Sequence, residues 1–299
     1  MTSAESFQLY AAIATPFKKN NSVDIEAMVT HAEWLLRVGC DGLVVFGTTG
    51  EAVSLTKDER IVTLSALVQR GIPAEKLLTG TGCCAIADTI ELSTRAHELG
   101  CQGVLIMPPF LFKGLTDEGL LETFRQIIQG VGKDDLNIFL YHFPALSGVS
   151  FTASLVNRLK AEFPNHINGY KDSGGDWENT RQIIASCQGV TVYSGSELPL
   201  NIVLEHGGAG CISATANTQA SVIRSVITAW EDGDAGALRA AQERASANRM
   251  KLQGYPPMIA AVKASIASRT GNEGWLNIRP PLMCLSKQDA DELVASLDL

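Results

Sequence analysis

Short apolar runs rich in β-branched residues recur along this chain, and longer amphipathic segments separate them. This alternation is typical of parallel strands joined by crossover helices. Eight runs are present, and eight strands can close into a (β/α)8 TIM barrel, an α/β fold that leaves no strand edge exposed. The predicted strands are Tyr10–Thr15, Gly42–Phe46, Leu77–Thr81, Gly103–Met107, Asn137–Tyr141, Ile167–Lys171, Val190–Ser194 and Gly210–Ser213.

The segments between these runs have the period of amphipathic helices, and several end at a glycine, which is common just past a helix C-terminus. We therefore expect helices between successive strands, each stopping where the glycine stands. The clearest cases are Asp24–Val38 before Gly39, Asp88–Leu99 before Gly100, and Thr116–Ile128 before Gly130.

The strand pattern stops near Gly233. We therefore divide the chain into a barrel domain, residues 1–233, and a C-terminal helical extension, residues 234–299, which packs on the barrel. The extension predicts helices at Ala235–Leu252, Met258–Ala267 and Lys287–Leu297, separated by Tyr255-Pro256-Pro257 and Arg279-Pro280-Pro281.

The formal net charge is −8, and the charges are scattered, so the sequence offers no electrostatic surface for nucleic acid or an anionic membrane. The seven cysteines form no C-x-x-C pair of the kind that holds zinc, so we expect reduced thiols, no metal and no cofactor. The first residues lack an export signal, and no apolar run reaches the roughly 18 residues that span a bilayer. We predict a soluble cytoplasmic protein that acts on a small molecule.

Polar residues follow three of the predicted strands, at the barrel end where active sites of this fold form. The turn Gly47-Thr48-Thr49-Gly50-Glu51 offers backbone N–H groups and hydroxyls to an anion such as a carboxylate. Tyr141 ends the fifth run and can transfer protons. Lys171 ends the sixth run, and a lysine amine shielded by barrel walls can attack a carbonyl carbon.

Each of these features also has a plain structural interpretation: a tight turn, a core tyrosine, and a surface lysine paired with Asp172. Their common position favours chemistry, because three strands that end at the same rim of a barrel bring their side chains to one cavity. His142 follows Tyr141, and alternation along the strand points the two side chains to opposite faces. We therefore expect a structural role for His142.

Several further motifs accompany these three in order along the chain. They are Ala14-Thr15-Pro16-Phe17, Tyr141-His142-Phe143-Pro144-Ala145-Leu146-Ser147-Gly148, Gly169-Tyr170-Lys171-Asp172-Ser173, Gly195-Ser196-Glu197, Gly207-Gly208-Ala209-Gly210-Cys211-Ile212-Ser213 and Arg279-Pro280-Pro281-Leu282. With the glycine–threonine turn, they make nearly the whole chain resemble the dihydrodipicolinate synthase/N-acetylneuraminate lyase family.

The resemblance implies a class I lyase or aldolase in which Lys171 forms a Schiff base with a pyruvate-type 2-oxo acid. It implies that Tyr141 transfers protons, that Thr49 relays protons to it, and that Thr48 with Thr49 binds the carboxylate. The implied partners are pyruvate and an aldehyde, and the implied assembly is a homotetramer. Further substrate contacts are expected at Gly47, Ser173, Gly195, Ser196, Glu197 and Ser213.

Departures from the family pattern bear on the substrate. Dihydrodipicolinate synthases normally hold the carboxylate of aspartate semialdehyde with an arginine where this chain has Leu146, and an apolar side chain cannot replace that clamp. Glu197 can accept hydrogen bonds from substrate hydroxyls or, alternatively, interact with the N-terminus of the following helix. Met107–Lys113 lacks the tyrosine that many members send into a neighbouring subunit's site, and Ser213–Asn217 resembles the synthase form more than the sialic acid lyase form.

The leading hypothesis is cleavage or formation of a 2-oxo-3-deoxy sugar acid or an N-acetylneuraminate-like compound, with pyruvate and an aldehyde as the smaller partners. The alternatives are a dehydratase of such sugar acids, a dihydrodipicolinate synthase (4-hydroxy-tetrahydrodipicolinate synthase), and a non-catalytic regulatory homologue that binds a 2-oxo acid. Pyruvate release indicates cleavage, whereas an unsaturated or semialdehyde product indicates dehydration.

Overall fold

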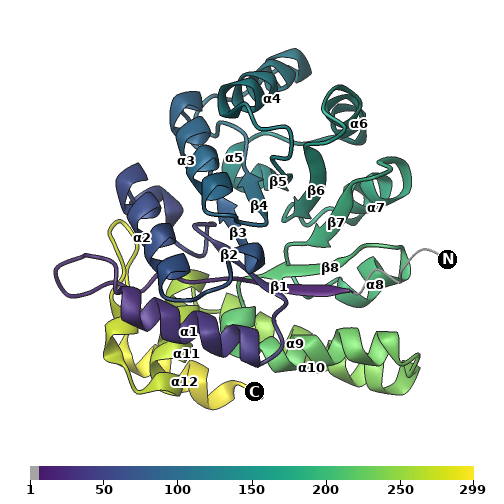
Figure 1. The fold of residues 1–299 in the computed structure, drawn as a ribbon. Helices are drawn as coiled ribbons and strands as arrows, with labels where there is room; N and C mark the ends of the chain where they lie inside the picture. The colour runs from purple at the N-terminus through teal and green to yellow at the C-terminus, as the bar shows by residue number, and fades with distance from the viewer. Residues whose placement is uncertain (1–6) are drawn as a thin grey trace.

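A computed structural model describes residues 7–299 and contains a closed barrel of parallel strands in sequence order, in which the eighth strand pairs with the first (Figure 1). Helices surround the barrel, which confirms the predicted (β/α)8 architecture. The strands are β1 Gln8–Ala12, β2 Gly42–Val45, β3 Leu77–Gly80, β4 Gly103–Ile106, β5 Ile138–His142, β6 Ile167–Asp172, β7 Thr191–Ser194 and β8 Gly210–Ser213.

Strands β2 to β8 match the predicted runs to within one residue at each end, whereas β1 begins and ends earlier than predicted. Gln8 already pairs with Gly210 of β8, which sets the early start. Beyond Ala12, the Asn217 side chain takes over hydrogen bonds of the β1 backbone, since it accepts from Ala14 N at 3.1 Å and donates to Ala12 O at 2.7 Å. The Asn217 side chain therefore marks the end of β1, and the alternation of apolar residues in the sequence does not predict this end.

Helices fill the connections between strands, and polar N-caps begin several of them; Asp24 and Thr56 accept from Ala27 N and Glu59 N, respectively. The short α5 (Pro144–Ser147) forms one turn directly after β5. The outer ring consists of α1 Ile25–Arg37, α2 Lys57–Gln69, α3 Ile86–Glu98, α4 Asp117–Val131, α6 Ala153–Glu162, α7 Trp177–Ser186, α8 Leu200–Glu205 and α9 Ala216–Glu231, with 3-10 turns at η1 Ala52–Ser54, η2 Ala74–Lys76 and η3 Glu273–Leu276.

Gly39 and Gly100 lie just past α1 and α3 with positive φ, as predicted, but the prediction for Gly130 is wrong. Helix α4 continues through Gly130, and Gly132 forms its left-handed C-cap. A Cβ on Gly130 would come within 2.4 Å of Ile90 Cδ1 on α3. This glycine therefore permits close packing of two helices, a role that its position in the sequence does not reveal.

The C-terminal extension is helical as predicted, with α10 Ala235–Gln253, α11 Met258–Thr270 and α12 Lys287–Ser296. In Figure 1 these helices lie along α1 and α9, on one side of the barrel. Lys263 of α11 is 1 % exposed and forms an ion pair with Glu51, which follows β2, so the extension is attached to the rim of the barrel. The domain boundary at residue 233 stays a prediction.

Two apolar clusters separate the inside of the barrel from its outer layer. The larger cluster fills the space between strands and helices and includes Leu9, Leu43 and Tyr170. The smaller cluster fills the barrel interior; its members are Tyr10, Ala12, Val44, Leu78, Leu105, Phe139, Tyr141, Tyr193 and Ile212. Side chains that alternate along a strand belong to opposite clusters, so the direction of each strand-end residue follows from its place in the alternation.

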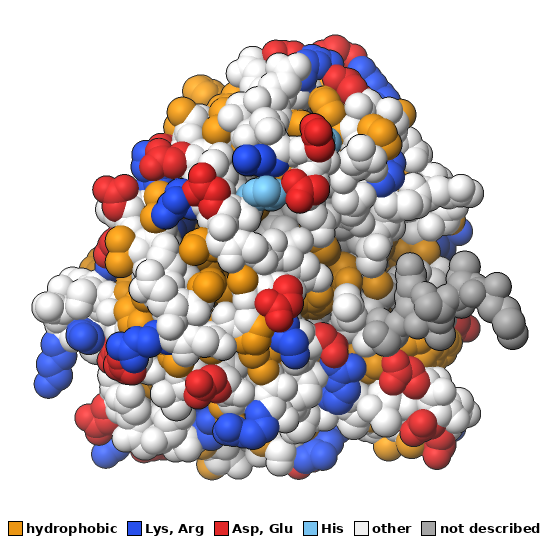
Figure 2. Space-filling model, viewed as in Figure 1, with side chains coloured by type: hydrophobic (Ala, Val, Ile, Leu, Met, Phe, Trp, Pro, Cys, Tyr) orange, Lys and Arg blue, Asp and Glu red, His pale blue; other side chains and the backbone are white. Residues whose placement is uncertain are grey.

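Acidic and basic side chains are interspersed over the face in Figure 2, which fits the scattered charge of the sequence. Within residues 7–299, no helix combines the length and the apolar character needed to cross a bilayer. The first six residues, on which the absence of an export signal was partly predicted, lie outside the described part of the chain.

Candidate active site

Lys171 and Tyr141 meet inside the barrel. They are register partners on β6 and β5, and both are nearly buried, with exposed fractions of 4 % and 5 %. The Lys171 Nζ atom lies 4.3 Å from the centroid of the Tyr141 ring. Among residues 7–299, the Lys171 amine has no hydrogen-bond or ion-pair partner, so it is available to a ligand.

The alternative interpretation of Lys171 as a surface lysine paired with Asp172 is wrong. Asp172 follows it on β6 and points to the outer side of the barrel wall, where its carboxylate accepts from Thr180 Oγ1 at 2.9 Å. His142 also points outward, as predicted: its Nδ1 accepts from Phe151 N at 3.1 Å. Burial lowers the pKa of His142, while the charge of Asp172 acts in the opposite direction.

The threonine turn after β2 brings Thr48, rather than Thr49, to the tyrosine. Thr48 Oγ1 lies 3.3 Å from Tyr141 Oη, within hydrogen-bond distance. Thr49 is 7 % exposed, and among residues 7–299 its hydroxyl has no such contact with Tyr141. The geometry therefore favours Thr48 over the predicted Thr49 as the hydroxyl next to Tyr141, and the proton relay itself stays a prediction.

An unusual backbone and a buried ion pair fix this turn. Phe46 and Glu51, at its two ends, have left-handed φ values of 56° and 55°, which cost non-glycine residues roughly 1 kcal/mol or more. The Glu51 carboxylate is 2 % exposed, pairs with Lys263 and accepts from Arg279 N at 3.2 Å. Burial lowers the pKa of Lys263, and Glu51 acts in the opposite direction. Lys263 does not stand out in the sequence, because its partner lies 212 positions away.

Ser173, Gly195 and Ser196 lie together where β6 and β7 end. Gly195 N donates to Asp172 O at 2.5 Å, and a Cβ on Gly195 would come within 2.0 Å of Ser173 Oγ. All three residues are half-buried, and Ser196 N donates to Ser194 Oγ at 3.2 Å. The lack of a side chain at Gly195 therefore leaves room for the serine hydroxyl at this rim.

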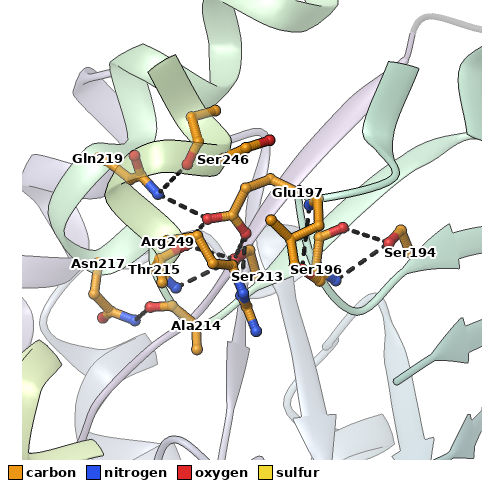
Figure 3. Close-up of polar contacts among 12 residues, drawn as sticks. Ser194, Ser196, Glu197, Ser213, Ala214, Thr215, Asn217, Gln219, Ser246 and Arg249 are labelled. Carbon is orange, nitrogen blue, oxygen red and sulfur yellow. Dashed lines mark hydrogen bonds and ion pairs between the residues drawn. The ribbon is translucent and has the colours of Figure 1, made fainter. Parts of the chain in front are cut away.

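Glu197 and Ser213 do not belong to this cluster of predicted site residues. Both are 0 % exposed and lie in the outer layer between β7, β8 and the helices (Figure 3). The Glu197 carboxylate accepts from Ser213 Oγ at 2.6 Å, from Gln219 Nε2 at 2.7 Å, from Arg249 Nη1 at 3.1 Å and from Thr215 Oγ1. Their predicted contacts with substrate are corrected, because protein donors already occupy the carboxylate and no water-accessible face remains.

A cavity of about 390 Å³ opens at the carboxyl ends of β2 to β5. Gly47, Thr48 and Tyr141 line it, so it reaches the tyrosine that contacts Lys171. Leu146 of α5, at the place of the family arginine, also lines it and is 49 % exposed. A second hollow of about 440 Å³ lies outside the barrel between α1 and the end of α11, and contains none of the predicted site residues.

The loop that follows β4, Met107–Lys113, has an exposed, apolar tip. Leu111 and Phe112 are 69 % and 66 % exposed. Lys113 Nζ donates to Phe110 O at 2.6 Å and to Ser147 O at 2.8 Å, which ties the loop to α5 beside Leu146. No tyrosine hydroxyl is present in this loop to extend the contact between Tyr141 and Thr48.

Residues 5–299 match the family model described as the dihydrodipicolinate synthetase family. An uncharacterized DapA-like lyase from Chloroflexus aurantiacus is 34 % identical over 99 % of this chain and 97 % of that protein. A 4-hydroxy-tetrahydrodipicolinate synthase from Corynebacterium urealyticum is 32 % identical over 96 % of this chain and 92 % of that protein.

Two solved structures share the fold along almost the full length. A dihydrodipicolinate synthase from Agrobacterium tumefaciens superposes with a TM-score of 0.89 at 34 % identity, covering 97 % of both chains. YagE from E. coli K12, solved in complex with pyruvate, superposes with a TM-score of 0.88 at 27 % identity, covering 97 % of this chain and 96 % of that one. The chain therefore belongs to the dihydrodipicolinate synthetase family, and it is a class I lyase or aldolase of that family.

Proposed function

We propose that this enzyme makes or breaks the carbon–carbon bond between pyruvate and an aldehyde, through a Schiff base on Lys171. The observation that carries the proposal is the Lys171 amine, 4 % exposed, beside the Tyr141 ring and without a protein partner among residues 7–299. A lysine in this situation can attack a ketone, whereas an ion-paired lysine such as Lys263 is held by its carboxylate.

In the cleavage direction, the substrate is a 4-hydroxy-2-oxo acid. The Lys171 nitrogen attacks the C2 carbonyl and water leaves, which gives a positively charged iminium. The C4 hydroxyl then loses its proton, the C3–C4 bond breaks, and its electron pair moves toward the iminium to form an enamine while the aldehyde departs. Protonation at C3 and hydrolysis release pyruvate and restore the amine.

Tyr141 and Thr48 are the candidates for moving these protons. The Tyr141 hydroxyl belongs to the side chain that lies against Lys171, and Thr48 Oγ1 is 3.3 Å from it. Such positioned groups commonly contribute about 10²–10⁴-fold to a rate. The turn Gly47–Gly50 supplies backbone N–H groups and the Thr49 hydroxyl as candidates to bind the substrate carboxylate, and Ser173, Gly195 and Ser196 are candidates at the opposite side of the rim.

Trapping the intermediate tests the proposal. Pyruvate with borohydride should convert the Schiff base into a stable secondary amine, and peptide mass spectrometry should locate the added mass at Lys171. Lys263 is the internal control, because it is buried but ion-paired with Glu51. Lys171→Arg should abolish both the adduct and turnover. An adduct confined to another lysine, or none in folded protein, would contradict the proposal.

The similar proteins suggest one candidate for the aldehyde that reacts with pyruvate. Several relatives are 4-hydroxy-tetrahydrodipicolinate synthases, so condensation of pyruvate with aspartate semialdehyde is a second candidate function. Leu146 at the rim does not favour it, since this side chain cannot pair with a second carboxylate. The sugar-acid substrate loses the support of Glu197, whose carboxylate is occupied.

The cysteines bear on the compartment in which the protein works, and the family resemblance bears on its oligomeric state. The seven cysteines are free thiols, which fits a reducing compartment, so we propose that the protein works in the cytoplasm. A homotetramer stays a prediction from the resemblance. One similar solved structure, at 26 % identity, is a monomeric dihydrodipicolinate synthase variant.

A further inference from the structure

The cavity that starts at Tyr141 and Thr48 is lined almost entirely by apolar side chains. Its walls come from the ends of β2 to β5 and from the C-terminal extension. The extension contributes Ile259, at the start of α11, and Leu282. The other apolar side chains of the wall that are larger than alanine are Phe46, Val53, Leu105, Met107, Phe110, Leu146 and Pro281.

Few polar groups are free to receive a ligand here. Glu51 is the only charged residue among those that line the cavity in the described chain, and its carboxylate is bound to Lys263 and to Arg279 N. Thr48 and Tyr141 contact each other at the end nearest Lys171. The one further hydroxyl of the lining belongs to Ser54, beside Val53, which is 77 % exposed.

A polyol chain or a second carboxylate would lose hydrogen bonds to water in this cavity without replacing them, which is unfavourable. An apolar group would gain by leaving water for the same walls. The room suffices for a ring, because an apolar protein cavity of about 150 Å³ binds benzene and this one measures about 390 Å³.

We infer that the aldehyde half of the substrate is apolar, aromatic or branched aliphatic, and that Leu146 and Leu282 help to select it. The inference rests on the proposed Schiff-base function and names its substrate class. The reaction is then R–CH(OH)–CH2–CO–COO⁻ to R–CHO plus pyruvate, with R in the apolar cavity and the C4 oxygen near the Tyr141 hydroxyl. No oxidant, reductant or further reactant is needed.

The test compares three 4-hydroxy-2-oxo acids that differ in R. The phenyl compound yields benzaldehyde, 2-oxo-3-deoxygluconate yields glyceraldehyde, and 4-hydroxy-2-oxoheptanedioate, which has an anionic R, yields succinic semialdehyde; pyruvate release measures cleavage of each. We expect kcat/KM for the phenyl compound to exceed both others by at least about tenfold, a typical discrimination for an apolar pocket. Higher kcat/KM for the polyol or the anionic compound overturns the inference.

Variants of the wall sharpen the test. Leu146→Asn and Leu282→Asn should each lower kcat/KM for the phenyl compound by about tenfold or more and change the polyol rate much less. Met283→Gln is the matched control, because Met283 follows Leu282 but is 70 % exposed and is not part of the lining. Equal losses for all three substrates would overturn the inference, since they would report general damage rather than selection.

Two further measurements separate the possible failures. Borohydride trapping of pyruvate does not involve R, so a Lys171 adduct together with a polyol preference overturns the inference and leaves the proposed function intact. Loss of that adduct in wild type overturns both. Light scattering of the variants covers the remaining case: if Leu146→Asn and Leu282→Asn change the oligomeric state and leave selectivity unchanged, a second copy covers the cavity and the inference is wrong.

Discussion

The hydroxyls of Tyr141 and Thr48 form the only side-chain hydrogen bond among residues 7–299 that joins the proposed proton-transfer group to the threonine turn. The two side chains come from β5 and from the turn after β2, and their oxygens are 3.3 Å apart. If protons move along this contact, neither hydroxyl works fully without the other. Removal of either one should then lower the rate by a similar amount.

Tyr141→Phe keeps the ring against Lys171 and removes the hydroxyl, so we expect kcat to fall by about 10²-fold or more while the pyruvate adduct still forms. Thr48→Val should have a comparable effect. Because the two groups share one hydrogen bond, the double variant should be little worse than either single one. Steady-state kinetics of the four proteins measure this coupling; strictly multiplicative losses would argue against a shared relay.

The sequence motif could not show which of the two threonine hydroxyls, Thr48 or Thr49, contacts Tyr141. The motif predicted that two adjacent hydroxyls serve the site, and the structure places both at the rim. The turn that carries both threonines begins at Phe46, whose backbone is left-handed, with a φ of 56°. A non-glycine residue in that conformation is held by its surroundings rather than by its own preference, so neighbouring sequence does not predict it.

The contacts of Glu197 show that α9 and α10 are attached to the barrel by a buried polar network. Ser213 at the end of β8, Gln219 on α9 and Arg249 on α10 all donate to its carboxylate, as Figure 3 shows for the side chains that surround it. Removing one member of a buried ion pair leaves the other charge without compensation, which commonly costs about 3–5 kcal/mol.

Glu197→Gln should therefore lower the free energy of unfolding by about 3 kcal/mol, because Arg249 loses its counter-charge, and should leave KM close to wild type in the folded fraction. Chemical denaturation and steady-state kinetics measure the two effects. Glu178→Gln on α7, which breaks an exposed pair with Arg181, is the surface control and should change stability little. A raised KM with unchanged stability would instead support contact between Glu197 and substrate hydroxyls.

The positions of the strands were predictable because each strand has its own apolar run in the sequence. The structure differs from the predictions where a contact with a residue distant in sequence decides the outcome. The apolar runs located β2 to β8 to within one residue, since burial on both faces of a barrel strand imposes continuous apolar sequence. The end of β1 depends on Asn217, and continuation of α4 through Gly130 depends on Ile90 of α3. The sequence predicted that Glu197 contacts either substrate hydroxyls or the N-terminus of the following helix; its carboxylate instead pairs with Arg249 on α10, 52 positions away.

Stability of the entire fold should depend on pH through His31, which connects α1 to α11 and to the strand ends. His31 Nε2 donates to Asn217 Oδ1 at 3.0 Å, because this oxygen also accepts from Ala14 N and so acts as an acceptor. The other ring nitrogen, Nδ1, accepts from Arg269 Nη2 at 2.9 Å. This arrangement assigns a neutral ring. Burial lowers the pKa of His31 from 6.5 to about 3; Asn217 opposes the shift, and the charge of Arg269 adds to it.

Below pH 6.5 the unfolded chain binds a proton at His31 and the folded protein does not, so stability is lost as pH falls toward about 3, by at most about 1.4 kcal/mol per pH unit. Denaturant unfolding of wild type and variant between pH 6.5 and 5.5 measures this contribution as a difference, because the lowered pKa of Glu59, about 2 beside Arg279, acts mainly at lower pH. His31→Gln should flatten the dependence, although His142, with a lowered pKa, retains a slope of the same sign. His97→Gln on the surface is the control; equal slopes in wild type and His31→Gln would refute the assignment.

Ile259 and Leu282 put the C-terminal extension in contact with the same cavity as Tyr141. Lys171 and Tyr141, proposed to act on the reacting bonds, reside on strands whose spacing is fixed by the closed sheet. Part of the wall proposed to receive the other half of the substrate resides on a segment outside the sheet. Substitutions in this segment can then change which aldehyde the enzyme accepts without moving the residues proposed to react. Homologues with conserved strand ends and divergent tails are where new aldehydes should be sought.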